Sequence, residues 1–484
     1  MVTIDGLTLD LADVVAVADG EDVVLAPEAL VRMDESRKSA EATALRRPVY
    51  GRSTGVGANR TVSLTAAEGR DTHGLKLLRS HAVDAGRALD RRTVRAMLVV
   101  RLSQLAAGGS GINPSIAEQL VELINSDVVP DIREFGGIGT ADLQALAGTA
   151  LTLLGERQPL DGGNVPVRLT AWATADALPF ISSSALTIGQ AILAQQKLSS
   201  LLDNAASSAA LSFIAMSGNS EALSPAVAAA ADTQEVASAA TMFHGMVHGS
   251  GEPARIQDPY CLRTLPQIFG SQAEELAGLH ALLSRLVTVG NENPLVHGSP
   301  SDGTNDVAHH GLFQMTNLAR RVDTLQLAIG AACATHLRRI DLLCDPKYTG
   351  LHPFLAEDGS GQSGVMMLEY VAAAAVGRIR ANAQPASLQT VVLSLGAEED
   401  ASFASVATAQ LESTADALAT VAAVELVCAS RALRLQGRRP EEFASARLRA
   451  MMQAGFTLPS DVEDRDLRGD LEMAIELIKG SYWK

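Results

Sequence analysis

Apolar residues recur every three to four positions over long stretches in the second half of the chain. Each stretch is longer than a typical helix of a globular protein, so the pattern predicts a bundle of long helices. The stretches are residues 184–216, 224–247, 313–343 and 400–436. Loops are expected to interrupt the bundle at residues 249–272, 289–311, 344–364 and 384–400.

The first part of the chain is more mixed. Short apolar runs such as EDVVLAP alternate with Gly-rich turns, and helical periods occur at residues 91–108 and 115–130. The sequence contains no internal repeat and no low-complexity linker. We therefore expect a mainly α protein with a mixed N-terminal domain over residues 1–182 and a long-helix bundle over residues 183–484.

The charge balance narrows the classes of partner. The chain carries 39 basic and 55 acidic residues, a formal charge of −16, which repels nucleic-acid phosphates and anionic membrane surfaces. Acidic residues near the N-terminus stand where a secretory signal needs a basic start, and no later stretch is expected to span a bilayer. We expect a soluble cytoplasmic protein that binds neither nucleic acid nor membrane.

Generic catalytic and metal-binding motifs are broken in this sequence. His244 and His248 lie one helical turn apart, as in a zinc protease, but Gly245 stands where the glutamate base is required. The glycine-rich phrases GVGANR, GGIGTAD and GQSG lack the spacing of a dinucleotide loop or a nucleophile elbow. No metal site is expected. The cysteines form no C-x-x-C pair and are expected to be buried thiols; they are Cys261, Cys333, Cys344 and Cys428.

A set of specific phrases occurs in a fixed order along the chain. They are YGRSTGVGANR, LKLLRSHAVDAGR, RLSQLAAGGSG, PDIREFGGIGTADLQALA, QDPYCLRTLPQIFG, NENPL, GQSGVMMLEYVAAAA and AEEDASF. Together they resemble the histidine and aromatic amino acid ammonia-lyase family over residues 40–435. The resemblance implies an ammonia-lyase/fumarase-like bundle of long helices and an N-terminal domain that carries the active-site loop. It also implies a homotetramer whose sites are shared between subunits.

The family's active-site loop reads G-S-V-G-A-S-G-D-L-A-P-L-A, and its Ala-Ser-Gly cyclises with loss of water to an electrophilic methylidene-imidazolone. Here the phrase is GGIGTADLQALA, one residue short and without a serine. The triad is either Thr140-Ala141 with one member deleted, or Gly139-Thr140-Ala141 ahead of Asp142. In the second alignment Ala141 would crowd the attacking nitrogen, for which glycine is suited. We expect no prosthetic group on this degenerate loop.

Positions near the missing group have changed as well. The family's L-I-N-G-T reads LTIGQ, which puts Ile188 at the asparagine, and G-N-F-H-G reads GLFQM. Phe313 is retained, while Leu312 replaces asparagine and Gln314 replaces histidine. Polar groups around the former electrophile have become mostly apolar, as expected of a site that no longer stabilises it.

The acid-base and anchoring positions of the resemblance are retained. Tyr50 matches the tyrosine that removes a proton from substrate, and His81 matches a histidine near the substrate side chain. The resemblance places Gln257, Tyr260 and Arg263 on a polar wall where the arginine holds the substrate carboxylate. Glu399 matches the acid of the Q-E-D motif. The pair His309-His310 has no counterpart and is expected to lie in a loop.

Three functions remain open. The favoured one is an enzyme that uses Tyr50 with Tyr260 or His81 for acid/base chemistry on a small carboxylate substrate, by elimination, addition, isomerisation or cyclisation. Ammonia elimination from an ordinary amino acid removes a weakly acidic proton and expels a poor leaving group. A tyrosine with its ordinary pKa near 10 is too weak to drive this reaction alone, so the substrate must itself be activated for it. The second is a non-catalytic homologue that binds a small acid or an active partner. The third is an ordinary aromatic amino acid ammonia-lyase or aminomutase with an unusual ring from Gly139-Thr140-Ala141.

Overall fold

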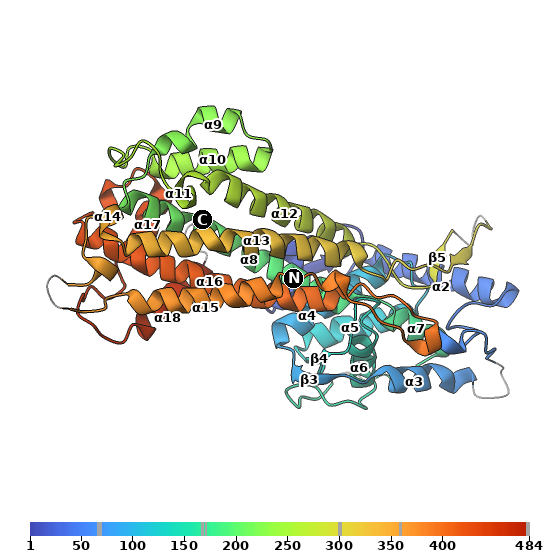
Figure 1. The fold of residues 1–484 in the computed structure, drawn as a ribbon. Helices are drawn as coiled ribbons and strands as arrows, with labels where there is room; N and C mark the ends of the chain where they lie inside the picture. Colours follow the sequence, from blue (N-terminus) through green and yellow to red (C-terminus); the bar gives the residue numbers. More distant parts are fainter. Residues whose placement is uncertain (65–69, 166–168, 170–171, 299–302, 358–360, 481–484) are drawn as a thin grey trace. The chain divides into compact units, whose positions relative to one another are not determined.

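The protein is mainly helical, in agreement with the sequence pattern (Figure 1). The computed structural model describes residues 1–64, 70–165, 169, 172–298, 303–357 and 361–480. The chain forms two compact units. The first comprises Met1–Leu193, Leu279–Val322 and Pro385–Ala409, and the second comprises Ala194–Gly278, Asp323–Gln384 and Gln410–Lys484. Four of the five boundaries fall within long helices, α8 (Ala185–Ala215), α12 (Leu265–Leu286), α13 (Thr316–Leu343) and α16 (Ala404–Leu435), and the fifth lies between Gln384 and Pro385.

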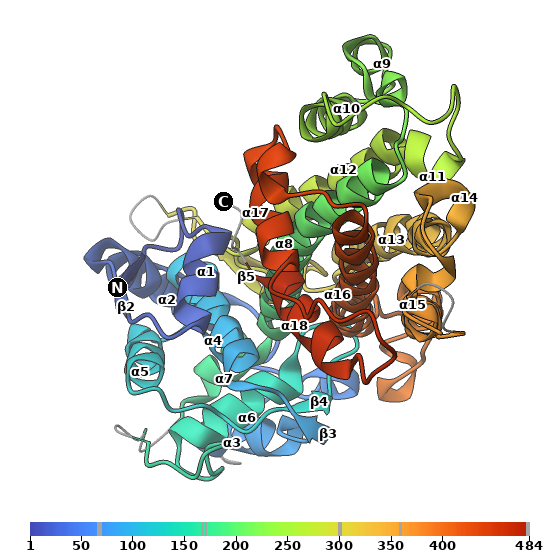
Figure 2. The same cartoon turned by 90° about the vertical axis from the view of Figure 1, so that its left-hand side faces the viewer.

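Helix α4 (Arg91–Ala106) is the core of the first unit. All its residues from Thr93 to Ala106 are buried, and the helices that pack against it include α1, α2 and α5 (Figure 2). The side chain of Asp90 starts it by accepting the Thr93 N–H at 2.8 Å. The other helices of this unit are α1 (Leu11–Ala18), α2 (Pro27–Arg46), α3 (Arg70–His81), α5 (Pro114–Asn125), α6 (Leu143–Leu153) and α7 (Thr174–Ile181).

Three two-stranded sheets occur within the described residues, all in the first unit. Strands β1 (Val2–Ile4) and β2 (Val23–Leu25) pair in parallel. Strand β3 (Ala85–Ala88) pairs antiparallel with β4 (Arg133–Phe135), which leads directly into the glycine-rich loop at 136–142. Strand β5 (Leu295–His297) pairs antiparallel with β6 (Asp306–Ala308).

Several long helices contribute most of their length to the second unit. Helices α13, α15 (Met366–Asn382) and α16 lie side by side in both views (Figures 1 and 2). Thr414 Oγ1 donates to Gln326 Oε1 at 3.3 Å and accepts from Asn382 Nδ2 at 3.2 Å, which links the three. The remaining helices are α9 (Pro225–Ala229), α10 (Gln234–Val247), α11 (Tyr260–Arg263), α14 (Pro346–Thr349), α17 (Ala446–Gly455) and α18 (Arg468–Lys479).

Short 3-10 helices shape the connections of both units. Those of the first unit are η1 (Gly57–Asn59), η5 (Ala386–Leu388) and η6 (Ser394–Gly396). Those of the second are η3 (Ser220–Leu223), η4 (Pro353–Leu355) and η7 (Pro440–Glu442).

A fully buried ionic cluster lies in the second unit. Arg339 Nε donates to Glu425 Oε1 at 2.6 Å, and Ser212 Oγ donates to the same oxygen at 2.9 Å. His336 Nδ1 lies 2.9 Å from Glu425 Oε2, and both side chains are inaccessible to solvent. The neighbouring Arg339 and His336 hold the pKa of Glu425 at about 2 despite burial, which acts in the opposite direction. Glu425 therefore remains a carboxylate at neutral pH.

Several expectations from the sequence need correction. The predicted helix at 224–247 is two helices, because α9 ends at Ala229 and the side chain of Thr233 starts α10 by accepting the Val236 N–H at 3.3 Å. The predicted loop at 249–272 is shorter, since α11 begins at Tyr260 and α12 at Leu265. The predicted domain boundary at residue 182 stays a prediction; the compact units group the later segments 279–322 and 385–409 with the first part of the chain.

One segment contradicts the expectation that no stretch is suited to spanning a bilayer. By length and composition, Thr174–Ala215 passes that test, with a mean hydropathy of 1.5 in its most apolar window. However, 94% of that window is buried inside the protein. This burial is the pattern of a core helix, in which apolar residues face other helices rather than lipid.

Candidate active site

The degenerate loop at 136–142 is held from two sides by other segments of the first unit. On one side, Thr140 forms an antiparallel bridge with Gln314, and the Met315 N–H donates to the Gly139 carbonyl at 3.2 Å. On the other side, Ser402 Oγ donates to the same carbonyl at 2.7 Å. The Phe403 N–H donates to the Ile138 carbonyl at 2.8 Å. The loop is thus fixed between the segments at 314–315 and 402–403.

Two residues of this loop have left-handed backbone conformations. Gly139 has φ +84°, and a Cβ there would lie 2.2 Å from Ser402 Oγ, so the close approach requires glycine. Ala141 has φ +77°, which is unusual for a residue with a side chain, and it is nonetheless buried. The loop therefore carries local strain at Ala141.

Asp142 ends the loop in a buried environment, with 1% of its surface exposed. Its carboxylate oxygens accept the Thr187 N–H and hydroxyl, both at 2.9 Å, in the first turn of α8. Its own N–H donates to the Ser183 carbonyl at 2.7 Å. Burial raises the pKa of Asp142 to about 6, against the lowering effect of the hydrogen bonds from Thr187. Asp142 therefore titrates close to neutral pH.

The residues of this loop do not fit a methylidene-imidazolone. The ring needs a central residue that eliminates a hydroxyl and a tight turn that brings the third nitrogen to the first carbonyl carbon. Thr140 is instead paired with Gln314 in an isolated bridge, and Ala141 stands at the third position, where the ring is suited to glycine. Ala141 adds a side chain beside the nitrogen that would attack.

Tyr50 is half-buried and is held at both ends. The Gly57 N–H donates to its phenol oxygen at 2.7 Å, and its own backbone N–H donates to His309 Nε2 at 3.2 Å. Burial raises the pKa of Tyr50; the Gly57 hydrogen bond lowers it, Glu398 raises it further and Arg60 lowers it. The net shift is upward, so Tyr50 is protonated at neutral pH.

The Tyr50 loop contacts the segment that contains the predicted Glu399. The Ala58 N–H donates to Ser394 Oγ at 3.0 Å, which joins η1 to η6. Glu399 itself is exposed. Its neighbour Asp400 accepts from Gln314 Nε2 at 2.7 Å and so reaches the residue that bridges Thr140. Asp400 was not predicted as a site residue, although it stands within the phrase AEEDASF, and His309 was predicted only as part of a loop.

The apolar replacements lie in different environments. Ile188 in α8 is completely buried, whereas Leu312 is 59% exposed. The Phe313 carbonyl accepts from Ser184 Oγ at 3.1 Å. Ile188 and Phe313 are thus on segments that flank the loop, but Ile188 presents no surface to a ligand in this conformation.

His81 is the last residue of α3, and its hydrogen bonds are local. Its Nδ1 lies 2.9 Å from the Leu77 carbonyl and 3.0 Å from Ser80 Oγ. These contacts do not tie it to the degenerate loop. Its predicted role beside the substrate stays a prediction.

Gln257, Tyr260 and Arg263 belong to the second unit and form a group of their own. The Arg263 guanidinium lies over the Tyr260 ring, 4.4 Å from its centroid. Tyr260 is 69% exposed, and Gln257 is exposed beside it. The buried cluster of Glu425 and Arg339 supports this group, because Arg339 donates to the Cys261 carbonyl at 3.2 Å.

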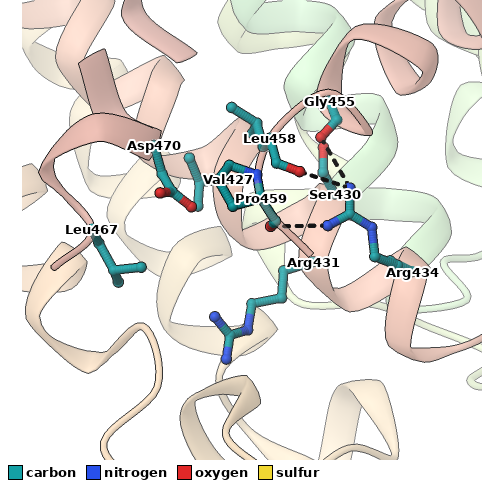
Figure 3. A pocket seen from close by; sticks show the side chains of 9 residues that line it. All are labelled: Val427, Ser430, Arg431, Arg434, Gly455, Leu458, Pro459, Leu467 and Asp470. Atoms are coloured by element: carbon teal, nitrogen blue, oxygen red, sulfur yellow. Dashed lines mark hydrogen bonds between the residues drawn. The ribbon is translucent and has the colours of Figure 1, made fainter. Parts of the chain in front are cut away.

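The second unit also contains a small pocket, whose lining residues all lie between Val427 and Asp470 in the sequence (Figure 3). It is lined by Ser430, Arg431, Arg434 and Asp470, with five further residues, and none of the predicted site residues is among them. The Arg434 guanidinium donates to the carbonyls of Gly455, Leu458 and Pro459 at 3.4, 3.3 and 3.1 Å. The N–H groups of Arg434 therefore hold the protein backbone in place. The pocket is not the candidate active site.

Comparisons with known proteins agree with the fold and the order of the phrases. The sequence model of the family described as aromatic amino acid lyase matches residues 9–455. Histidine ammonia-lyase from Streptomyces coelicolor is 31% identical, over 97% of this chain and 95% of that protein. Histidine ammonia-lyase from Treponema denticola is 30% identical, over 99% and 96%.

Solved structures share the fold over nearly the whole chain. Phenylalanine aminomutase from Pantoea agglomerans superposes with a TM-score of 0.92 at 24% identity, covering 100% of this chain and 99% of that one. The ergothioneine-degrading enzyme ergothionase from Treponema denticola gives a TM-score of 0.90 at 22% identity, covering 99% and 98%. At these identities the likeness concerns the fold.

Proposed function

The chain belongs to the aromatic amino acid lyase family and is an enzyme, and from this premise we propose that it works without a methylidene-imidazolone. In this proposal Tyr50 performs acid/base chemistry on a small carboxylate substrate that carries its own activation. The reaction is an elimination, addition, isomerisation or cyclisation. The observation that carries the proposal is the loop at 136–142, which lacks a serine and holds Thr140 in a bridge with Gln314.

Tyr50 has the contacts that proton transfer requires. The Gly57 N–H donates to the phenol oxygen at 2.7 Å, and this donor stabilises the phenolate that forms when Tyr50 gives up its proton. Burial and Glu398 act in the other direction and keep the phenol protonated at rest. Tyr50 is therefore suited to donate its proton to the leaving group of the substrate, after which the phenolate can accept a proton from the substrate.

We place the carboxylate anchor on Arg263, with Tyr260 beside it, contributed by another copy in a homotetramer. The family resemblance implies shared sites, and the exposure of this group supports the assignment. Ile256, next to Gln257, is 93% exposed, as expected of an apolar side chain that a partner covers. A guanidinium binds a carboxylate through two parallel hydrogen bonds, which fixes both position and orientation.

The intact mass of the purified protein tests the proposal first. An unmodified mass is expected, and a deficit of two waters would contradict it. The next measurement is turnover of a panel of carboxylates that bear a good leaving group, including ergothioneine, the compound degraded by the structurally similar Treponema enzyme. Tyr50→Phe should abolish turnover of the substrate found, because the variant retains the ring but has no proton to transfer. An unchanged rate would refute the role of Tyr50.

An ordinary ammonia-lyase or aminomutase is the second candidate, and it is favoured by the 30–31% identity to histidine ammonia-lyases. It requires a ring from Gly139-Thr140-Ala141 and predicts an ultraviolet absorbance that the unmodified chain lacks. It also predicts ammonia release from histidine, phenylalanine or tyrosine. The mass measurement separates the two candidates before any substrate is known.

A further inference from the structure

His309 is hydrogen-bonded to the backbone of Tyr50, although the two are far apart in the chain. It follows strand β6, and its Nε2 accepts the Tyr50 N–H at 3.2 Å. The hairpin of β5 and β6 is fixed against the segment before Tyr50 by an apolar cluster of Ala40, Val49, Val296 and Val307. The position of His309 is therefore set by packing, not by the loop that carries it.

Polar contacts fix the same hairpin to the end of α2. Arg46 donates to the Asn305 carbonyl at 2.6 Å, and Arg47 forms an ion pair with Asp306 at 2.6 Å. These bonds hold the strand that precedes His309. Tyr50 is consequently attached to a rigid support through its N–H, while its phenol oxygen is held by Gly57.

The bond to Tyr50 requires one protonation state of His309. A ring nitrogen accepts a hydrogen bond only when it carries no proton, so Nε2 is bare and the proton of the neutral ring is on Nδ1. Protonation would turn Nε2 into a second donor facing the Tyr50 N–H. Two donors repel each other, so the bond would be lost and the backbone at Tyr50 released.

We propose that His309 is a positioning residue for Tyr50, and that its protonation switches the enzyme off in acid by releasing the Tyr50 backbone. This inference rests on the proposed role of Tyr50 in proton transfer. It adds a pH-dependent element that the family resemblance does not supply, since His309-His310 has no counterpart there.

The charged and titratable groups around His309 favour the neutral ring. Partial removal of the imidazole from water lowers its pKa, and Arg47 and His310 lower it further, whereas Asp306 raises it. Asp306 is engaged by Arg47, which limits its effect on the imidazole. Because its pKa is lowered, the ring should be neutral and the bond present at neutral pH, and the bond should be lost only when the pH falls below the ordinary pKa of histidine, about 6.5.

The amide of Tyr50 reports this bond without any substrate. The chain has 5 tyrosines, so protein labelled with [¹⁵N]tyrosine gives a simple amide spectrum, and Tyr50→Phe assigns the signal of residue 50. In the protein without substitutions, the chemical shift of the Tyr50 amide should change with pH along a single titration curve, below about pH 6.5. A Tyr50 amide that does not respond to pH between about 5 and 8 would overturn the proposal.

Variants at residue 309 show whether a change in the Tyr50 signal comes from its hydrogen bond to His309 or from a general disturbance of the fold. In His309→Gln the amide oxygen can still accept, so the Tyr50 signal should keep its neutral position and lose its titration. In His309→Lys the signal should resemble the acid form at every pH. His309 is exposed, so neither change disturbs the core. His297→Gln, an exposed histidine on β5 of the same hairpin, is the matched control and should leave the titration unchanged.

Turnover gives the functional readout once a substrate is known. The acid limb of kcat against pH should follow the Tyr50 amide titration and should move to lower pH in His309→Gln. An acid limb that stays in place in His309→Gln would show that His309 does not control activity. If Tyr50→Phe retains full turnover, the proposed function fails instead, and the amide titration still decides whether the bond responds to pH.

Discussion

Replacing Asp142 with asparagine should remove a pH dependence of stability that can be worked out from the structure. Asp142 is buried at the end of the degenerate loop, and burial raises its pKa from 3.8 to about 6. The folded protein therefore binds a proton at Asp142 more tightly than the unfolded chain does. This contribution to stability is fully present below pH 3.8 and is lost as the pH rises through about 6.

The expected size follows from the two pKa values. A difference of about two pKa units, from 3.8 to about 6, corresponds to about 3 kcal/mol at roughly 1.4 kcal/mol per unit. Asp142→Asn cannot titrate, and it keeps one oxygen that can accept from Thr187. The free energy of unfolding of the unmodified protein, minus that of Asp142→Asn, should thus fall by about 3 kcal/mol between about pH 4 and pH 7.

Urea unfolding at a series of pH values, followed by circular dichroism, measures this difference. Taking the difference between the two proteins cancels the other carboxylates, which titrate in both. The competing effect is the first turn of α8, whose N–H groups favour a negative charge at Asp142. If the difference rises with pH instead of falling, the helix terminus outweighs burial, and the reasoning about Asp142 is refuted.

Two further substitutions test the packing around the two groups of site residues. Glu425→Gln should destabilise the protein by about 3–5 kcal/mol, because it leaves the Arg339 guanidinium buried without a counter-charge. Thermal unfolding checks this, with Glu442→Gln on the surface as a control that should barely change Tm. Ala141→Gly should stabilise the protein by about 1 kcal/mol in urea unfolding, since glycine adopts φ +77° without strain; a loss of stability would contradict that strain.

The long helices could be predicted because each carries enough apolar positions for a repeat to stand out. Helices α8, α13 and α16 begin and end within four residues of the predicted stretches. The break between α9 and α10 was missed because alanine is compatible with both helix and turn, and Thr233, which starts α10, is a weak signal in an alanine-rich run. Periodicity also cannot show that residues 279–322 and 385–409 pack with the first unit.

The candidate site shows the same limit at the level of single residues. Phrases along the chain pointed to Tyr50 and to the shortened loop, because those residues stand in recognisable order. The contact of Tyr50 with His309 depends on a hairpin of two three-residue strands, which is too short to leave a pattern in the sequence. Asp400 was not predicted because the family motif pointed to its neighbour Glu399. Only the structure could show that Gln314 donates a hydrogen bond to Asp400.

The double attachment of the Gly139 carbonyl bears on how this loop could change in evolution. Ser402 and Met315 both bind that one oxygen, and Phe403 binds the carbonyl of the residue before it. An inserted residue would have to be absorbed between Gly139 and the buried Asp142, where Thr140 is already paired. A longer loop would thus require matching changes in the segments at 314–315 and 402–403. We therefore expect this loop to tolerate a change of side chain more readily than a change of length.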